Sequence, residues 1–181
     1  MDRPTYSIEI VYKDLMGTLD KVCWANTVWN RAVTPRSRFV VWLAYQERLK
    51  TKQRLMSTGV VDDELCPICE TQTESTTHIF FQCGFSSQCV EALKHWAGVN
   101  WSINSMMDIL RKRHMPRKKS TLVEAIFCNL IYAIWSVRNE AIWHKRVPTV
   151  WKVVESVKAE SKIIFNSLTL NNPTSLWLST L

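Results

Sequence analysis

The sequence predicts an all-α fold, a compact multi-helix domain with one embedded loop of potential metal ligands. Only four of its 181 residues are glycine, and alternating runs of Val, Ile and Thr are few, which favours helices over a sheet. Apolar residues instead recur at helical spacing along most of the chain. With 46% hydrophobic residues and nine tryptophans, the chain can bury a sizeable core.

The best break in the chain is Met115-Pro116, inside a run of basic residues that we expect to form an exposed loop. We expect residues 1–115 to hold N-terminal helices and the metal loop. Residues 116–181 are then a C-terminal helical lobe that packs on the first part, so that the two form one structural unit.

Helices are predicted before the loop over residues 6–16, 19–32, 36–48 and 51–57. Ser7 is expected to cap the first helix and Gly17 to end it. The third helix begins after Thr34-Pro35. Its spacing is expected to turn five side chains inward: Phe39, Val40, Trp42, Leu43 and Tyr45.

Helices are predicted after the loop over residues 86–97, 105–113, 120–145 and 149–168. The 120–145 helix has apolar residues on two faces, so we expect it to be buried on two sides. Ser120 and Glu124 lie close to the spacing of a capping box at its start. We find no apolar run of about 18 residues and expect no membrane span.

The loop carries the ligand pattern Cys66-x2-Cys69-x8-His78-x4-Cys83. Between its last two ligands, Ile79, Phe80 and Phe81 form a short apolar turn that we expect to pack the loop onto the neighbouring helices. Three thiolates and one imidazole make a tetrahedral donor set that suits zinc, and four protein ligands leave no open position for water or substrate. The pattern therefore predicts a structural zinc. Two alternatives stay open: disulfides among these cysteines, and Cys89 as a ligand in place of Cys83.

Positive charge is concentrated in two segments of a chain whose formal net charge is +7. Residues 31–54 hold seven Lys/Arg and one Glu, residues 111–119 hold six Lys/Arg, and the remainder is net negative. Focused positive charge favours polyanions through counterion release. The alternative is that these segments are solvated helix faces and a linker.

The segment from Pro35 to Cys83 resembles the zinc-binding domain of plant LINE-type (non-LTR) retrotransposon reverse transcriptases. The matching runs are RSRFVVWLAYQERLKTKQRLMSTGVVDDELCPIC and ESTTHIFFQC, and the flanks YSIEIVYKDLM and IWSVRNEAIWHKR extend the resemblance over about residues 6–165. Family members often have Gly where this chain has Glu70, and usually Pro where it has Gly84. The polymerase, endonuclease and ribonuclease H parts have no counterpart in the sequence, and we expect a stand-alone copy.

The resemblance implies a structural zinc and a non-catalytic role in holding nucleic acid, RNA more than DNA. It makes these residues phosphate-binding candidates: Arg36, Arg38, Arg48, Lys50, Lys52, Arg54, Arg111, Lys112, Arg113, Arg117, Lys118 and Lys119. The alternative is a protein-interaction adapter that presents its apolar last helix and the Trp177 tail. Without a Gly-rich phosphate loop or a Ser-His-Asp arrangement, we expect neither an enzyme nor a small-molecule substrate. Metal-binding cysteines suit the nucleus or cytoplasm.

Overall fold

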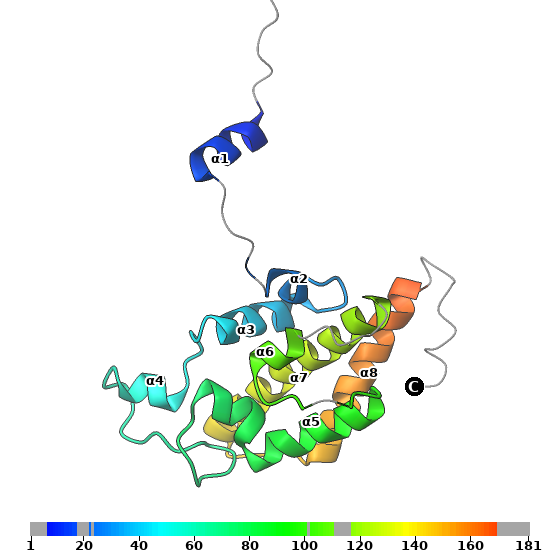
Figure 1. Ribbon diagram of the computed structural model, residues 1–181. Coiled ribbons are helices and arrows are strands. Elements are labelled where there is room, and N and C mark those ends of the chain that lie inside the picture. The colour runs from blue at the N-terminus through cyan, green and yellow to red at the C-terminus, as the bar shows by residue number, and fades with distance from the viewer. Residues whose placement is uncertain (1–6, 18–21, 23, 101, 111–116, 170–181) are drawn as a thin grey trace, which may run out of the picture.

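The computed structural model describes residues 7–17, 22, 24–100, 102–110 and 117–169. Within these residues the fold is all-α, as predicted, and the strand-like pairing is a single antiparallel bridge between Leu65 and Thr73 (Figure 1). The elements are α1 (Ile8–Met16), α2 (Ala25–Val28), α3 (Pro35–Tyr45), α4 (Lys52–Met56), the π-helix η1 (His78–Gln82), α5 (Gly84–Trp96), α6 (Met106–Leu110), α7 (Arg117–His144) and α8 (Val150–Thr169).

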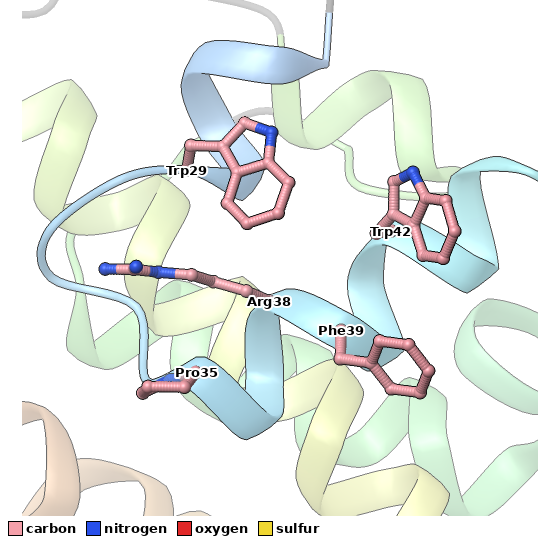
Figure 2. A pocket seen from close by; sticks show the side chains of 5 residues that line it. All are labelled: Trp29, Pro35, Arg38, Phe39 and Trp42. Atoms are coloured by element: carbon pink, nitrogen blue, oxygen red, sulfur yellow. The ribbon is translucent and has the colours of Figure 1, made fainter.

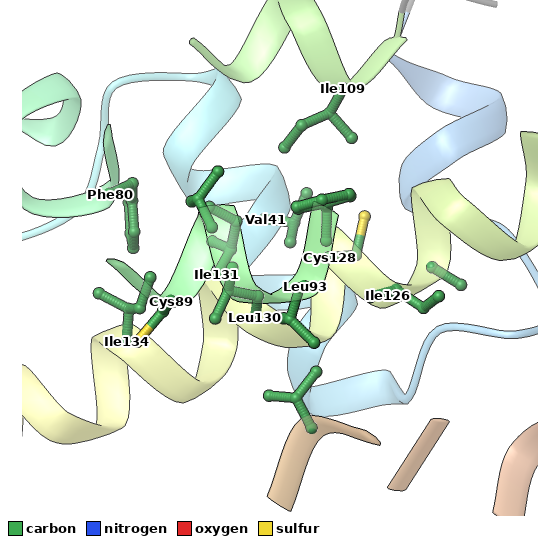
Figure 3. Close-up of a cluster of buried hydrophobic side chains, with 14 of the residues drawn as sticks. Val41, Phe80, Cys89, Leu93, Ile109, Ile126, Cys128, Leu130, Ile131 and Ile134 are labelled. Atoms are coloured by element: carbon green, nitrogen blue, oxygen red, sulfur yellow. The ribbon is translucent and has the colours of Figure 1, made fainter. Parts of the chain in front are cut away.

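Helix α7 is the centre of the fold. It packs against α2, α3, α5, α6, α8 and η1 (Figure 1). Its buried apolar residues point to more than one side of the helix, so the predicted two-sided burial is confirmed; they include Ile126, Phe127, Leu130, Ile131 and Ile134. Figure 3 shows several of them among side chains from α3, α5 and η1 in the same hydrophobic core.

The two-sided burial of α7 also corrects one expectation. Residues Lys119–His144 are long and apolar enough for a membrane-spanning helix by length and composition, although no such segment was expected. The interior of the protein buries 67% of the most apolar window of this helix. A core helix that packs on several sides needs apolar residues around most of its circumference, and this accounts for the composition.

Several predicted boundaries move. Helix α2 spans only Ala25–Val28 instead of 19–32, and residues 19–21 and 23 of that prediction lie outside the described part.

Phe39 was expected inside, yet its side chain is 59% exposed. Helix α3 buries only a narrow face, formed by Ser37, Val40, Val41 and Ala44, and Phe39 lies off that face.

The start of α7 also differs from its prediction. Arg117, Lys118 and Lys119 were expected in an exposed loop, but they form the first turn of the helix. Ser120 therefore lies inside the helix and is not its cap, and its hydroxyl donates to the Glu124 carboxylate one turn later (3.1 Å). The helix predicted over 105–113 is observed as Met106–Leu110, since its last three residues lie outside the described part.

Helix α1 lies apart from the helical body in Figure 1. It was predicted from an apolar stripe, and the helix itself is confirmed. Its side chains Ile8, Ile10, Tyr12 and Leu15 are nevertheless solvent-exposed, with Ile8 82% and Leu15 81% exposed. The amphipathic pattern of α1 is thus not used to build the core.

Candidate metal centre

The four predicted ligands come together. The sulfurs of Cys66, Cys69 and Cys83 and one ring nitrogen of His78 lie within 4.8 Å of one another, and the Cys69 sulfur lies 3.4 Å from His78 Nε2. Tetrahedral zinc with bonds of about 2.0–2.3 Å brings its donors to similar separations. Cys66, His78 and Cys83 are buried. The donor set and its geometry therefore fit a zinc ion.

The Cys-x-x-Cys turn is shaped by main-chain hydrogen bonds. The Glu70 amide donates to the Cys66 carbonyl (2.8 Å), and the Cys66 amide donates to the Gln72 carbonyl (2.8 Å). This folds the chain back after Cys69, and Glu70 takes a left-handed conformation with φ of 56°. Glu70 stands where the resembled family often has Gly, a residue that adopts positive φ without steric cost.

The second pair of ligands is set by η1. The Cys83 amide donates to the carbonyl of His78 (2.7 Å), which closes one π-type turn over the four intervening residues. Because one such turn spans five residues, the His78 and Cys83 side chains reach the same point. The intervening Ile79, Phe80 and Phe81 are buried in the core, which confirms that they pack this module onto its neighbours.

The thiols of Cys66 and Cys83 influence each other. A hydrogen bond between them raises the pKa of Cys66, and burial raises it further. The same hydrogen bond lowers the pKa of Cys83, helped by the amides of Phe85 and Ser86 at the start of α5. Without a metal, Cys66 thus keeps its proton more strongly than Cys83 does, and zinc would displace it because thiolates are the ligands.

The two alternatives for this loop are not supported. The cysteines in the described part are free thiols, namely Cys66, Cys69, Cys83, Cys89 and Cys128. Cys89 lies on α5 outside the ligand cluster, and burial raises its pKa to about 11. A buried thiol with a raised pKa behaves as a small apolar side chain rather than as a ligand.

A buried ion pair connects the metal loop to α7. Glu74 lies between the second and third ligands and is 0% exposed. Arg138 of α7 donates to both of its oxygens, from Nε (2.7 Å) and from Nη2 (3.1 Å). The guanidinium also lies over the Trp135 ring, 4.7 Å from its centroid. Sequence reasoning did not predict this pair, because Arg138 stands beside Asn139 and Glu140 and reads there as part of the polar end of the helix.

The same pair fixes the turn before α4. The Lys52 amide donates to a Glu74 oxygen (2.9 Å), and Arg138 Nη2 donates to the Lys50 carbonyl (2.8 Å). Both contacts use the main chain of the turn. The Lys50 side chain therefore stays exposed on a turn whose backbone is held by the metal loop and by α7.

The phosphate-binding candidates of the first basic segment form two groups. Arg36 and Arg38 lie in the first turn of α3, and the other group follows its last turn: Arg48, Lys50, Lys52 and Arg54. An eleven-residue helix is about 16 Å long, so the groups are separated by roughly that distance. Arg36, Arg48, Lys50 and Arg54 are exposed. Lys52 is half-buried and pairs with Asp63 (2.6 Å), and that hydrogen bond lowers the pKa of Asp63.

The predicted second basic segment is only partly placed. Arg111, Lys112 and Arg113 lie outside the described residues. Arg117 and Lys118 begin α7, and Lys119 is half-buried. Of the predicted basic surface, the structure therefore places chiefly the two groups at the ends of α3.

The metal loop, its π turn and the helices before it lie in one continuous stretch of the chain. Residues 6–89 match the family model described as zinc-binding in reverse transcriptase. The matched stretch contains all four ligands and Glu74, whereas Arg138 lies beyond it. Searches of curated proteins and of solved structures each gave no match.

Proposed function

We propose that this chain is a zinc-stabilised, non-catalytic module that binds nucleic acid, RNA in preference to DNA. We further propose that it derives from the reverse transcriptase of a plant LINE-type retrotransposon and acts in the nucleus or cytoplasm. The observation that carries the proposal is the basic turn at residues 48–54, whose main chain is held by Glu74 of the metal loop. The family match to a reverse-transcriptase module supports it.

In this proposal zinc has a structural role. The residues that would hold it are Cys66, Cys69, His78 and Cys83. Four protein ligands complete a tetrahedron and leave no position for a substrate. When bound, the ion cross-links the Cys-x-x-Cys turn to η1 and so fixes the loop that carries Glu74.

The basic turn would make phosphate contacts. Arg48, Lys50 and Arg54 have exposed side chains on a backbone fixed from within. Fixing the backbone lowers the entropy that these side chains lose on binding. Phosphate contacts position a nucleic acid without reading its sequence, so we expect modest sequence specificity and a steep dependence on salt.

The test is binding of the zinc-loaded chain to single-stranded RNA and to duplex DNA across a salt series. Lys50→Ala should weaken binding to either and lower the salt slope by about one. The matched control is Lys162→Ala, which removes one exposed charge from α8. A salt-independent affinity, or equal losses from the two variants, contradicts the proposal.

A protein-interaction adapter is the second candidate, but on a different surface from the one expected. Much of the apolar stripe of α8 is buried, including Val153, Val157 and Phe165, and the Trp177 tail lies outside the described residues. The exposed apolar face of α1 favours this candidate instead. A defined protein partner that stays bound after nuclease treatment, and is lost with Leu15→Glu, would support it.

A further inference from the structure

Three aromatic side chains form an exposed pocket next to the first basic group. The pocket has a volume of about 250 Å³ and is lined by Trp29, Pro35, Arg38, Phe39 and Trp42. Trp29 is 61% and Phe39 59% exposed. Figure 2 shows the Arg38 side chain running between Trp29 and Pro35, with Phe39 and Trp42 on the other side of the pocket. Exposed tryptophan and phenylalanine gathered on one surface mark a binding site more often than a solvated face.

The walls of this pocket are held in place. Asn30 follows Trp29, and its side chain donates to the Thr121 carbonyl of α7 (2.8 Å) and accepts from the Ala32 amide (2.9 Å). The Asn30 carbonyl accepts from Arg38 Nη2 (3.0 Å). The loop that carries Trp29 is therefore held to α7 through Asn30 and to α3 through Arg38.

The far wall is anchored in the core. Trp42 packs partly against the buried cluster, and the Phe39 ring lies against it with centroids 6.0 Å apart. An aromatic platform that is fixed before binding loses little side-chain entropy when a ligand stacks on it.

The electrostatics select the occupant. No Asp or Glu occurs in residues 21–46, a stretch that carries Lys21, Arg31, Arg36 and Arg38. Arg36 is held with its guanidinium 5.5 Å from the centre of the Tyr132 ring of α7. A ligand in this pocket thus meets aromatic faces together with positive charge, and single-stranded nucleic acid offers the matching flat bases and phosphates.

We propose that the pocket between Trp29, Phe39 and Trp42 takes an unpaired nucleobase, with the adjacent phosphates on Arg36 and Arg38. This inference rests on the proposed function and makes it more specific: the bound polymer is single-stranded at this point. A duplex keeps its bases stacked on one another and cannot fill the pocket. The site therefore discriminates strand state and not sequence, because every base has a stacking face.

The experiment measures binding of the full zinc-loaded chain to a 12-nucleotide oligouridine and to a blunt RNA duplex of equal length. Trp29→Ala should weaken single-strand binding about five- to hundredfold, the range for loss of one stacked base, and leave duplex binding unchanged. Trp151→Ala is the matched control, because Trp151 is 70% exposed on α8. A 2-aminopurine base in the oligonucleotide reports stacking directly, and its fluorescence should fall with the wild-type chain but not with Trp29→Ala.

The outcomes separate the two proposals. If neither nucleic acid binds, both proposals fail. If binding is salt-dependent but Trp29→Ala behaves like Trp151→Ala, the pocket proposal is overturned and the proposed function stands. A proline-rich peptide that binds the wild-type chain and is lost with Trp29→Ala, while oligouridine binding persists, also overturns it.

Discussion

Two buried glutamates connect α7 to other parts of the chain, and they use different partners. Glu74 connects the metal loop to Arg138 through an ion pair and also accepts from a main-chain amide of the basic turn. Glu124, nearer the start of α7, accepts from two hydroxyls, that of Thr27 (3.1 Å) and that of Ser120 (3.1 Å). Both carboxylates are at least nine-tenths buried.

The two attachments therefore differ in how much stability is lost when one partner is removed. Removing one partner of a buried ion pair strongly lowers the stability of the fold, because the remaining charge is left buried without compensation. Hydrogen bonds from hydroxyls to a carboxylate are individually weaker contributors. The Glu74 attachment also involves the loop that carries the metal ligands, whereas the Glu124 attachment joins α2 and α7, neither of which carries a ligand.

The largest expected effect is loss of the metal site. Cys66→Ser should abolish stoichiometric zinc binding and lower the free energy of unfolding by about 5 kcal/mol or more, since structural zinc contributes on the order of 10 kcal/mol in small zinc modules. Elemental analysis and denaturant unfolding measure the two quantities. Cys89→Ala is the control: zinc stays at one per chain. Full zinc in Cys66→Ser would refute the assigned ligand set.

The ion pair comes next. Arg138→Met keeps the side-chain volume but leaves the Glu74 carboxylate buried without its counter-charge, and should cost about 3–5 kcal/mol of unfolding free energy. The double variant Glu74→Gln with Arg138→Met should recover part of that loss, because it removes the uncompensated charge. Denaturant midpoints with a constant m-value measure both. A loss below about 1 kcal/mol in Arg138→Met would show that water reaches this pair.

Acidification should weaken zinc binding at the metal loop. The pKa of Cys66 is raised, so at neutral pH the metal-free site keeps a proton on Cys66. Zinc must displace that proton, so its affinity rises with pH and falls as pH falls, by about tenfold per pH unit for each displaced proton. Competition with a chromophoric chelator between pH 6 and 8 measures it. An affinity that does not change over this range contradicts the proton linkage.

Removing a hydrogen bond to Glu124 should lower the free energy of unfolding by less than breaking the Glu74–Arg138 pair does. Thr27→Val keeps the shape of the buried side chain and removes one donor to Glu124, which should cost about 1–3 kcal/mol. Zinc content should not change, because Thr27 lies at the other end of α7 from Arg138. Thr58→Val, at an exposed hydroxyl, is the control and should change stability by less than about 0.5 kcal/mol. Zinc loss from Thr27→Val would mean that the two attachments are coupled.

Sequence reasoning succeeded where the signal was local. The four ligands fall within residues 66–83, so their spacing alone placed them at one point, and the structure confirms it. Helices α5, α7 and α8 followed from apolar periodicity over more than ten residues each, with their starts shifted by one to three positions. Long periodic segments carry enough repeats to overcome local irregularities.

It failed where the outcome depended on distant partners. Glu74 and Arg138 are 64 residues apart, and neither spacing nor composition links them. The exposure of Phe39 follows from the narrow face by which α3 meets α7, a tertiary fact absent from the periodicity of α3. The π turn at η1 was expected as a simple apolar turn, because its extra residue has no sequence signature.

The smallest expected effect comes from a position where the sequence departs from the resembled family. Glu70 has φ of 56°, a conformation that costs a side chain with a Cβ roughly 1 kcal/mol and costs Gly nothing. Glu70→Gly should therefore raise the free energy of unfolding of the zinc-loaded chain by about 0.5–1 kcal/mol. In a chain of this size each kcal/mol corresponds to a rise in Tm of about 2–4 °C.

Glu70→Ala is the matched control for this substitution, because it removes the same charge but keeps the Cβ in the left-handed conformation. Thermal unfolding should place Ala near the wild type and Gly above both. If Ala stabilises as much as Gly, the gain comes from removing a carboxylate next to the thiolate ligands and not from the backbone. The stability of the metal loop would then be limited by repulsion between the Glu70 carboxylate and the thiolates. Because salt screens this repulsion, the gain from either substitution should shrink as the salt concentration is raised.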